Sequence, residues 1–272
     1  MIQWTFGVTP LLIAGPCVVE PPAVMDRVAN TLAALAARWS IPVCFKASFD
    51  KANRASALGP RGPGLEEGLR ALERVRREFG LPVLTDVHEP GQVAAAAEVV
   101  DVLQIPAFLS RQTDLLLAAG ASGRPVNVKK GQWMAAEGLV GAVEKLRLGG
   151  ATDLAVTERG TFFGYGDLVV DMRNLERMRA ATGGATVLFD ATHSVQRPGT
   201  ALEGASGGDR AAIPALLFAA AAAGADGFFI ETHPDPSMAL SDRATQWPLD
   251  QLESLVTRAL GVWRATREQS DA

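Results

Sequence analysis

Short apolar runs that contain β-branched residues recur along the chain, and each has the length of a β-strand. In the stretches between them, apolar residues return at every third or fourth position, which is the spacing of an amphipathic helix. Val28, Leu32, Leu35 and Trp39 are one example, and the stretch 249–263 is another. The pattern therefore predicts strands that alternate with helices. The eight expected strands begin at Leu11, Val43, Val83, Val100, Val126, Leu154, Thr186 and Gly227.

A strand followed by a helix, eight times in succession, is typical of an α/β protein built as a (β/α)8 barrel. An open, doubly wound sheet gives the same alternation, so repetition alone leaves both folds open. The length of 272 residues suits a single barrel domain over 1–272. The segment 2–6 is expected to add a short strand or hairpin that closes the lower end of the barrel.

The polar residues favour the barrel, because ionisable and amide side chains gather where the expected strands end. In a (β/α)8 barrel these ends meet at one mouth, which is where such enzymes hold their active sites. Three long connections, 50–64, 194–208 and 233–248, leave strands at the same end and predict binding loops or lids. The residues at the strand ends are Lys46, Ser48, Asp86, His88, Gln104, Lys129, Lys130, Glu158, Arg159, Asp190, His193, Glu231 and His233.

Composition narrows the class of protein further. The chain has 48% hydrophobic and 21% charged residues, and its longest apolar runs are shorter than the ~20 residues of a membrane helix. The start MIQWTFGVTP lacks the features of a secretory signal, so we expect a cytoplasmic protein that does not associate with membranes. A net charge of −4 gives no reason to expect a nucleic acid partner.

Cationic side chains are concentrated at the predicted mouth. One such residue is more often a solvated surface charge, but six at one mouth indicate a substrate with more than one anionic group. A lysine on a barrel strand is also able to form a Schiff base with a carbonyl substrate, and Lys46 and Lys129 are candidates for that chemistry. The six cations are Lys46, Lys51, Arg54, Lys129, Lys130 and Arg159.

Four further residues at strand ends or in the following loops carry metal-binding side chains: Cys17, His193, Glu231 and Asp242. Thiolate, imidazole and carboxylate together suit one divalent ion such as Zn²⁺, Fe²⁺ or Mn²⁺. The four positions form no compact spacing motif, so a core role for Cys17 stays open on the residues alone. Cys44 lies inside a strand and is expected in the core.

Several blocks of sequence resemble one enzyme family over nearly the whole chain. The family is 3-deoxy-D-manno-octulosonate 8-phosphate synthase, which condenses phosphoenolpyruvate with D-arabinose 5-phosphate and supplies a lipopolysaccharide sugar. The resemblance implies the same activity here, in a barrel homotetramer. The blocks are KASFDKANRAS (46–56), RGPGLE (61–66), TDVHEP (85–90), QIPAFLSRQTDLL (104–116), VNVKKGQ (126–132), TERGTFFGYGDLVVDMR (157–173), FDATHSVQ (189–196), SGGDR (206–210) and ETHPDP (231–236).

The same resemblance implies roles for individual residues. Lys129 and Arg159 would hold the phosphoenolpyruvate phosphate and Lys51 its carboxylate, while Lys46 and Asp86 would lie beside the reacting sugar. The family's pattern places further substrate contacts at Gln104, Ala107, Phe108, Asn53 and Arg54, and at Arg111, which would reach the sugar phosphate of a neighbouring subunit. Proton transfer falls to His193, Asp86, His88 or Asp242.

The family resemblance also bears on Cys17, because metal-independent members have Asn at this position and metal-dependent members have Cys. The chain resembles the metal-dependent class, with Cys17, His193, Glu231 and Asp242 as the implied ligands. It departs from the family pattern at Ala55, where members have Ser after the KANR motif. A hydroxyl contact to the sugar phosphate is therefore expected to be missing or shifted.

Three other functions are compatible with parts of this pattern. The related 3-deoxy-arabino-heptulosonate 7-phosphate synthases use erythrose 4-phosphate and share the GPC-type first strand, but they have a K-P-R-T pattern where this chain has KANR. A Schiff-base aldolase would use one of the strand lysines. A non-catalytic phosphosugar-binding scaffold would keep the barrel and bind its ligand without turnover.

Overall fold

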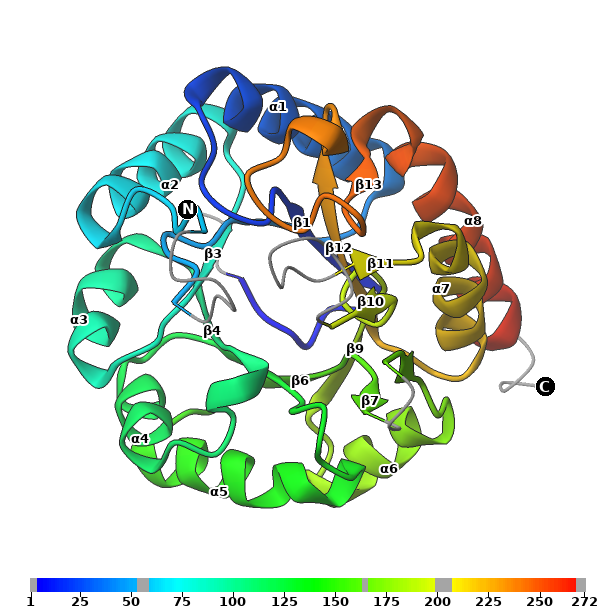
Figure 1. Ribbon diagram of the computed structural model, residues 1–272. Coiled ribbons are helices and arrows are strands. Elements are labelled where there is room, and N and C mark those ends of the chain that lie inside the picture. The colour runs from blue at the N-terminus through cyan, green and yellow to red at the C-terminus, as the bar shows by residue number, and fades with distance from the viewer. Residues whose placement is uncertain (1–3, 53–58, 163–165, 199–206, 268–272) are drawn as a thin grey trace.

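Eight parallel strands form a closed ring in the computed structural model, which describes residues 4–52, 59–162, 166–198 and 207–267 (Figure 1). The ring closes because β1 pairs with both β2 and β12. An open doubly wound sheet would leave two unpaired edges, so the barrel prediction is confirmed. The strands, in their order around the ring, are β1 (Leu11–Gly15), β2 (Val43–Lys46), β3 (Val83–Asp86), β4 (Val102–Ile105), β5 (Val126–Lys129), β6 (Leu154–Glu158), β9 (Thr186–Asp190) and β12 (Gly227–His233).

Helices surround this ring and bury their apolar faces against it (Figure 1). The first helix begins after Pro21 and buries Val28, Leu32, Leu35 and Trp39, the residues whose spacing predicted it. None of the described helices is long and apolar enough to cross a membrane. In the described part of the chain the helices are α1 (Pro22–Trp39), α2 (Leu65–Phe79), α3 (Pro90–Val99), α4 (Thr113–Ala121), α5 (Val140–Gly149), α6 (Arg173–Ala181), α7 (Ile213–Ala222) and α8 (Leu252–Arg267).

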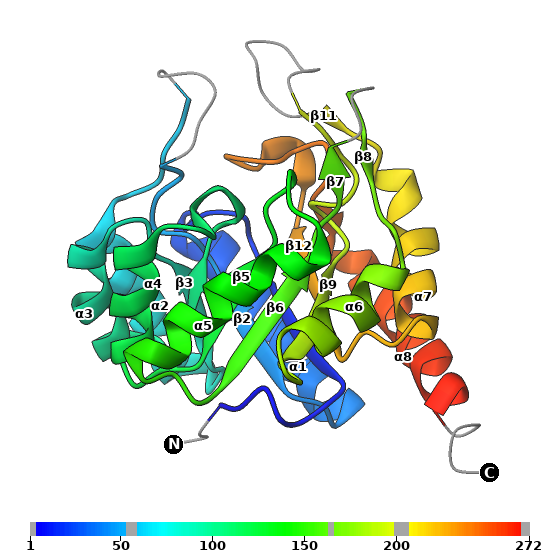
Figure 2. The same cartoon turned by 90° about the horizontal axis from the view of Figure 1, so that it is seen from below.

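Short strands of two residues each lie at the carboxyl-terminal end of the barrel. The hairpins β7 (Thr161–Phe162) with β8 (Leu168–Val169) and β10 (Gln196–Arg197) with β11 (Gly207–Gly208) stand above the mouth (Figure 2). A further strand, β13 (Trp247–Pro248), pairs with the end of β12. The long connections after β9 and β12 therefore carry structure of their own beside the mouth.

The segment before β1 crosses the opposite end of the barrel (Figure 2). Its described residues form turns, so the expected strand is not observed there. A closed ring offers no free edge for another strand, and Phe6 pairs with side chains instead. Its N–H donates to Asp153 and its carbonyl accepts from the Thr186 hydroxyl. Trp4 and Phe6 are buried and plug the lower end of the barrel.

Alternation along the strands divides the barrel interior into layers. Successive side chains of a strand point to opposite faces, so residues two apart share the inner face. The lower inner layers are apolar and include Leu11, Ile13, Cys44, Leu84, Val102, Ala155, Leu188 and Phe229. Cys44 is thus a core residue, as expected. Two residues further along, the same inner face carries Lys46, Asp86, Gln104, Thr157, Asp190 and Glu231, all of them buried.

Candidate active site at the barrel mouth

Cys17 lies two residues beyond β1 and is held against β2. The chain passes so close to β2 that a Cβ on Gly15 would lie 2.1 Å from the Lys46 carbonyl oxygen, so only glycine fits there. The Cys17 carbonyl accepts hydrogen bonds from Lys46 Nζ at 2.9 Å and from the Ser48 backbone N–H. This arrangement points the Cys17 thiol at the mouth, where Sγ lies 3.0 Å from Asp242 Oδ2.

Glu231 lies at the centre of the site, on the inner face of β12. Its Oε1 accepts from Lys46 Nζ at 2.8 Å and lies 3.7 Å from His193 Nε2, whereas none of the described residues donates a hydrogen bond to its buried Oε2. Burial alone would raise the pKa of Glu231, but the charges of Lys46 and His193 lower it by more. Glu231 is therefore an ionised carboxylate with one oxygen left over.

Asp242 approaches the same point from the long loop after β12. Its backbone is in the left-handed region, with φ of 50°, which is uncommon for a residue other than glycine. Hydrogen bonds hold the carboxylate there, from Cys17 and Ser241 to Oδ2 and from Gln196 to Oδ1. Such a strained backbone persists only where the surrounding structure fixes it.

These three residues form a set of donors that suits a metal ion. One donor atom each of Cys17, Glu231 and Asp242 lies within 4.8 Å of the others. His193 adjoins the set, and its Nδ1 is engaged by Asp190 at 2.7 Å, so Nε2 is the ring atom left for a ligand. Burial raises the pKa of the Cys17 thiol, and Asp242 and Glu231 raise it further, so the thiol keeps its proton until a cation arrives.

Lys129 and Asp190 form a second buried pair inside the barrel. Lys129 Nζ lies 2.5 Å from Asp190 Oδ2 and 3.0 Å from the centre of the Phe229 ring. Burial lowers the pKa of Lys129 from 10.5 to about 8, although the Asp190 carboxylate opposes the shift. Asp190 also accepts from the backbone N–H groups of Thr192 and His193, which turns the chain after β9 and places the His193 ring.

Arg159 follows β6 and is buried near the carboxylates of Glu231 and Asp242. Its Nη2 donates to Gln196 Oε1 at 2.6 Å, whereas its buried Nη1 has no hydrogen-bond partner in the described part of the chain. An unpartnered buried guanidinium nitrogen is costly, and a negatively charged ligand at that atom would satisfy it. Arg159 is thus poised to accept an anion.

A third group of polar residues lies at the ends of β2 and β3. Lys51 Nζ donates to Ser48 Oγ, which donates to Asp86 Oδ1 at 2.5 Å, and His88 Nε2 lies 3.1 Å from Asp86 Oδ2. Burial would raise the pKa of Asp86, but the hydrogen bond with His88 and the Lys51 charge hold it well below its usual value. The His88 ring meets Phe49 edge to face.

Gln104 is fixed inside the barrel by a chain of amide and hydroxyl groups. Asn127 donates to Gln104 Oε1 at 3.0 Å, and Thr157 donates to Asn127 Oδ1 at 2.7 Å. All three side chains are buried. Two residues beyond Gln104, the chain turns into the short helix that contains Ala107 and the half-exposed Phe108.

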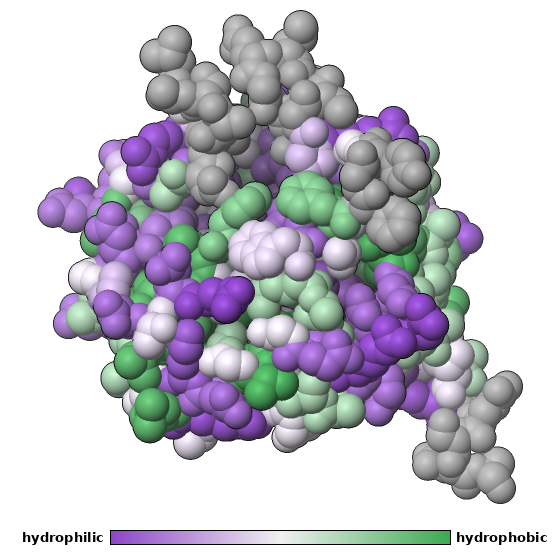
Figure 3. All heavy atoms as spheres, turned by 60° about the horizontal axis from the view of Figure 1, so that its bottom comes forward, coloured by the Kyte–Doolittle hydropathy of each residue, from purple (hydrophilic) through white to green (hydrophobic). Residues whose placement is uncertain are grey.

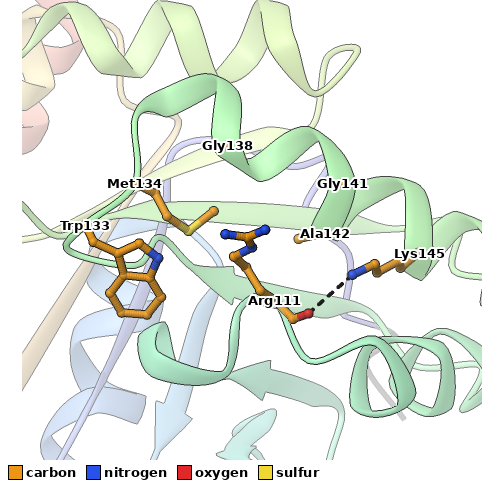
Figure 4. Close-up of a pocket in the computed structure, with 7 residues that line it drawn as sticks. All are labelled: Arg111, Trp133, Met134, Gly138, Gly141, Ala142 and Lys145. Atoms are coloured by element: carbon orange, nitrogen blue, oxygen red, sulfur yellow. Dashed lines mark hydrogen bonds between the residues drawn. The ribbon is translucent and has the colours of Figure 1, made fainter.

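Arg111 lies away from the central cluster, on the outer side of the mouth. It lines a pocket of about 360 Å³ together with Trp133, Met134 and Lys145 (Figure 4). Its guanidinium points between Met134 and Ala142, and Lys145 Nζ donates to the Arg111 carbonyl at 3.2 Å. Among the described residues, none of the other predicted substrate contacts lines this pocket.

One predicted anion-binding cation has a different role. Strand alternation turns Lys130 away from Lys129, and the Lys130 ammonium is completely buried among protein oxygens. It donates to the carbonyls of Gly131, Met134 and Gly160, and it lies 3.4 Å from Glu158. Lys130 therefore stabilises the loops after β5 and β6 and is not available to a substrate.

Three further predictions fall on residues that the structure does not describe. Asn53 and Arg54, the expected contacts of the sugar phosphate, and Ala55, the departure from the family motif, lie outside the described residues.

The sequence reasoning missed Gln196, Asn127 and Thr157. Gln196 follows a strand end by several residues and carries no charge, so nothing in its spacing distinguished it. Asn127 and Thr157 had a usable signal, since each is a polar residue inside an otherwise apolar strand. In a barrel strand such a residue belongs to the inner face near the mouth.

Comparison with known proteins places these features in context. The model of the family described as DAHP synthetase I matches residues 7–266. A protein of Acidithiobacillus ferrooxidans named 2-dehydro-3-deoxyphosphooctonate aldolase is 53% identical over 245 residues, which cover 90% of this chain and 86% of the relative. Proteins with the same name from Nitratidesulfovibrio vulgaris and Nitrobacter winogradskyi are 52% identical over 252 residues and 55% identical over 250 residues. These matches cover 93% and 92% of this chain, and 91% and 86% of the two relatives.

The buried pair of Lys46 and Glu231 generates a prediction about stability. Lys46→Met removes one partner and leaves a buried carboxylate uncompensated, so we expect the free energy of unfolding to fall by about 3 kcal/mol. The double variant Lys46→Met, Glu231→Gln removes both charges and is expected to be more stable than Lys46→Met alone. Urea unfolding followed by circular dichroism measures both. Glu231→Gln alone completes the cycle, and a double variant that loses the sum of the Lys46→Met and Glu231→Gln losses would show that the pair is not coupled.

Proposed function

Because the chain belongs to the DAHP synthetase I family and, within it, to the 3-deoxy-D-manno-octulosonate 8-phosphate synthases, we propose that it condenses phosphoenolpyruvate, D-arabinose 5-phosphate and water. The products are 3-deoxy-D-manno-octulosonate 8-phosphate and phosphate. The first of these is a precursor of a lipopolysaccharide sugar. The name 2-dehydro-3-deoxyphosphooctonate aldolase denotes the same enzyme. The relatives bear this name, and none of those described above is named for the heptulosonate reaction, so the erythrose 4-phosphate alternative is not favoured.

The observation that carries the proposal is the set of buried cations with free donor capacity at one mouth. Phosphoenolpyruvate is held at its phosphate by Lys129 and by the unpartnered Nη1 of Arg159. Lys51 approaches its carboxylate, and Gln104, Ala107 and Phe108 line the pocket. The network of Asn127 and Thr157 supports this assignment for Gln104, because it fixes the amide before any ligand binds.

Arabinose 5-phosphate is placed with its aldehyde beside Lys46 and Asp86. Asn53 and Arg54 are assigned to grip the sugar and its phosphate, and Arg111 is assigned to the sugar phosphate of a neighbouring subunit. Arg111 lines its pocket with the half-exposed Trp133, whose ring contacts that of the half-exposed Phe108, and this exposed surface supports a role of Arg111 toward another copy of the chain. We include the homotetramer in the proposal on this ground.

The reaction itself forms one carbon–carbon bond and breaks one carbon–oxygen bond. Carbon 3 of phosphoenolpyruvate attacks the sugar aldehyde, positive charge develops at carbon 2, water adds there, and phosphate leaves by cleavage of the carbon–oxygen bond. The added water gives up both of its protons as its oxygen becomes the carbonyl oxygen at carbon 2. One proton is gained by the former aldehyde oxygen and the other leaves with the phosphate. The groups assigned to these transfers are Asp86, His88, His193 and Asp242, which all lie at the mouth.

Cations contribute to this reaction mainly by bringing two anions together. Two phosphorylated substrates repel each other in water, and a site of fixed cations cancels that repulsion before the bond forms. Lys46 is engaged by Glu231 and the Cys17 carbonyl, and Lys129 by Asp190, so each ammonium is held in place as a charge. This arrangement favours charge compensation over a Schiff base.

We also propose one divalent metal ion, held by Cys17, His193, Glu231 and Asp242. The converging donor atoms, the unpartnered Glu231 Oε2 and the Asp190 hydrogen bond that leaves His193 Nε2 available support this ligand set. When bound, the ion would supply positive charge that polarises an oxygen, either of water or of the sugar aldehyde. A cytoplasmic location completes the proposal and agrees with two cysteines that are free thiols.

The substrate assignment predicts a strong preference for one aldose. We expect phosphoenolpyruvate to be consumed with arabinose 5-phosphate at least about tenfold faster than with erythrose 4-phosphate, which a 1.4 kcal/mol difference in transition-state binding provides. The measurement is the loss of phosphoenolpyruvate absorbance, before and after chelator treatment and after adding back Mn²⁺ or Zn²⁺. Faster turnover with erythrose 4-phosphate would overturn the assignment, whereas activity that survives verified metal removal would overturn only the metal proposal.

The ligand set predicts that one of the two cysteines is needed for metal binding. Cys17→Asn is expected to weaken Mn²⁺ affinity by about tenfold or more, because it replaces a thiolate with a neutral amide. Electron paramagnetic resonance of free Mn²⁺ measures the affinity without reference to activity. Cys44→Ala is the matched control and keeps the wild-type affinity. Equal affinities in the wild type and Cys17→Asn would remove Cys17 from the site.

The lowered pKa of Lys129 predicts how phosphoenolpyruvate binding responds to pH. The ammonium loses its proton as the pH rises through about 8, so kcat/KM for phosphoenolpyruvate is expected to fall above that pH. The groups facing Lys129 are Asp190, Lys46 and Glu231, and the lysine is the one whose charge is lost in this range. Lys129→Arg keeps a permanent cation and is expected to move the decline to higher pH. Identical pH profiles for wild type and Lys129→Arg would exclude Lys129 as the titrating group.

A further inference from the structure

Gln196 connects two parts of the site that have different chemistry. Arg159 Nη2 donates to Gln196 Oε1 at 2.6 Å, and Gln196 Nε2 donates to Asp242 Oδ1, also at 2.6 Å. The Gln196 side chain is buried, so neither bond competes freely with water. A single amide thus joins the cation assigned to the phosphoenolpyruvate phosphate to a carboxylate assigned to the metal.

The chemistry of its two partners fixes the orientation of this amide. A guanidinium only donates hydrogen bonds and an ionised carboxylate only accepts them. The reversed amide would place its NH₂ group against the Arg159 guanidinium and its carbonyl against the Asp242 carboxylate. Gln196 is therefore a directional link, with its acceptor toward Arg159 and its donor toward Asp242.

The backbone around Gln196 leaves the side chain little room to shift. Gln196 pairs with Gly208 in the β10–β11 hairpin. A Cβ on Gly208 would lie 2.2 Å from Thr245 Cγ2, so the hairpin rests directly on the loop that carries Asp242. Thr245 is in turn tied to that loop by its N–H, which donates to the Asp242 carbonyl at 3.0 Å.

Arg159 and Asp242, the two residues that Gln196 joins, each have a further feature that bears on the coupling. At one end, Arg159 Nη1 is buried and has no hydrogen-bond partner among the described residues, so it is available to an anion. At the other end, Asp242 is held in a left-handed backbone conformation, and its Oδ2 accepts from Cys17 and Ser241. Gln196 donates to the other oxygen, Oδ1, so a change in the position of the guanidinium reaches the Asp242 carboxylate through this one amide.

We propose that Gln196 is a positioning residue that couples the phosphoenolpyruvate phosphate site at Arg159 to the carboxylate of Asp242. The inference rests on the proposed function for the identity of the anion. Because coupling of this kind is reciprocal, removing the Asp242 carboxylate changes phosphoenolpyruvate affinity, and it does so through Gln196.

A double-mutant cycle in chelator-treated protein tests this coupling without any metal. The four proteins are wild type, Gln196→Met, Asp242→Gly and the double variant, where glycine accepts the left-handed backbone at 242. Isothermal titration calorimetry gives the Kd for phosphoenolpyruvate in the absence of sugar. We expect each single variant to weaken binding by about threefold to tenfold and the double variant to be no weaker than the weaker single.

Two controls separate coupling from a general loosening of the mouth. Arg197→Gln alters the neighbouring residue of the same short strand and is expected to combine additively with Asp242→Gly. The Kd for arabinose 5-phosphate, measured on the same four proteins, is expected to show additive effects. A purely structural role for Gln196 would make both substrates respond alike.

The outcomes distinguish failure of this inference from failure of the proposed function. Additive losses in phosphoenolpyruvate affinity, or equal non-additivity for both substrates, would overturn the coupling and leave the synthase assignment intact. Wild-type protein that binds no phosphoenolpyruvate would overturn both. A result that the metal site is absent would leave the cycle valid, because it is measured on metal-free protein.

Discussion

The buried ion pair between Lys46 and Glu231 is the interaction on which the mouth of this barrel depends. It joins the inner faces of β2 and β12, on either side of β1, and the same Lys46 ammonium holds the Cys17 carbonyl. Taking two charges out of water is costly, and the attraction between them repays that cost only with good geometry. The pair is therefore better understood as a device that fixes the thiol, the carboxylate and their neighbours in one arrangement than as a source of stability.

Other charged side chains at the mouth are also buried and paired, and some of them keep one hydrogen-bonding atom unused. Lys129 is held by Asp190, and Arg159 by Gln196, yet Arg159 Nη1 and Glu231 Oε2 remain without hydrogen-bond partners among the residues that the structure describes. One of these spare atoms donates and the other accepts, so the site offers separate places for an anion and a cation. On the face seen in Figure 3, hydrophilic side chains surround small groups of apolar ones.

Much of this arrangement was predictable from the sequence, because successive side chains of a strand face opposite sides and every second residue faces the barrel interior. The alternation of strands and helices predicted an α/β fold, and the polar residues at strand ends favoured the barrel and predicted Lys46, Asp86, Gln104 and Glu231 at its mouth. The rule also shows why Lys130 was misassigned, since adjacent residues of a strand face opposite sides and only Lys129 faces inward. Counting charges at a strand end without their alternation overstates the number available to a substrate.

Other features depended on contacts that no local pattern records. Gln196 gains its place from Arg159 and Asp242, which are far from it in sequence, and an uncharged amide gives no sign of such partners. The segment 2–6 was expected to add a short strand that closes the lower end of the barrel, but a closed ring has no edge to receive another strand. The convergence of Cys17, Glu231 and Asp242 brings together the end of β1, the inner face of β12 and the loop after β12. The residue types at strand ends suggested this set without any compact spacing motif, and the resemblance to a known family strengthened it.

A crystal structure of the protein with Mn²⁺ and phosphoenolpyruvate, in the absence of sugar, tests the central claim most directly. The account predicts one anomalous peak in contact with Cys17, His193, Glu231 and Asp242, and phosphate density between Lys129 and Arg159 Nη1. Manganese bound elsewhere, or phosphate density away from these two cations, would contradict the claim that the spare donors and acceptors of the mouth define the two binding places.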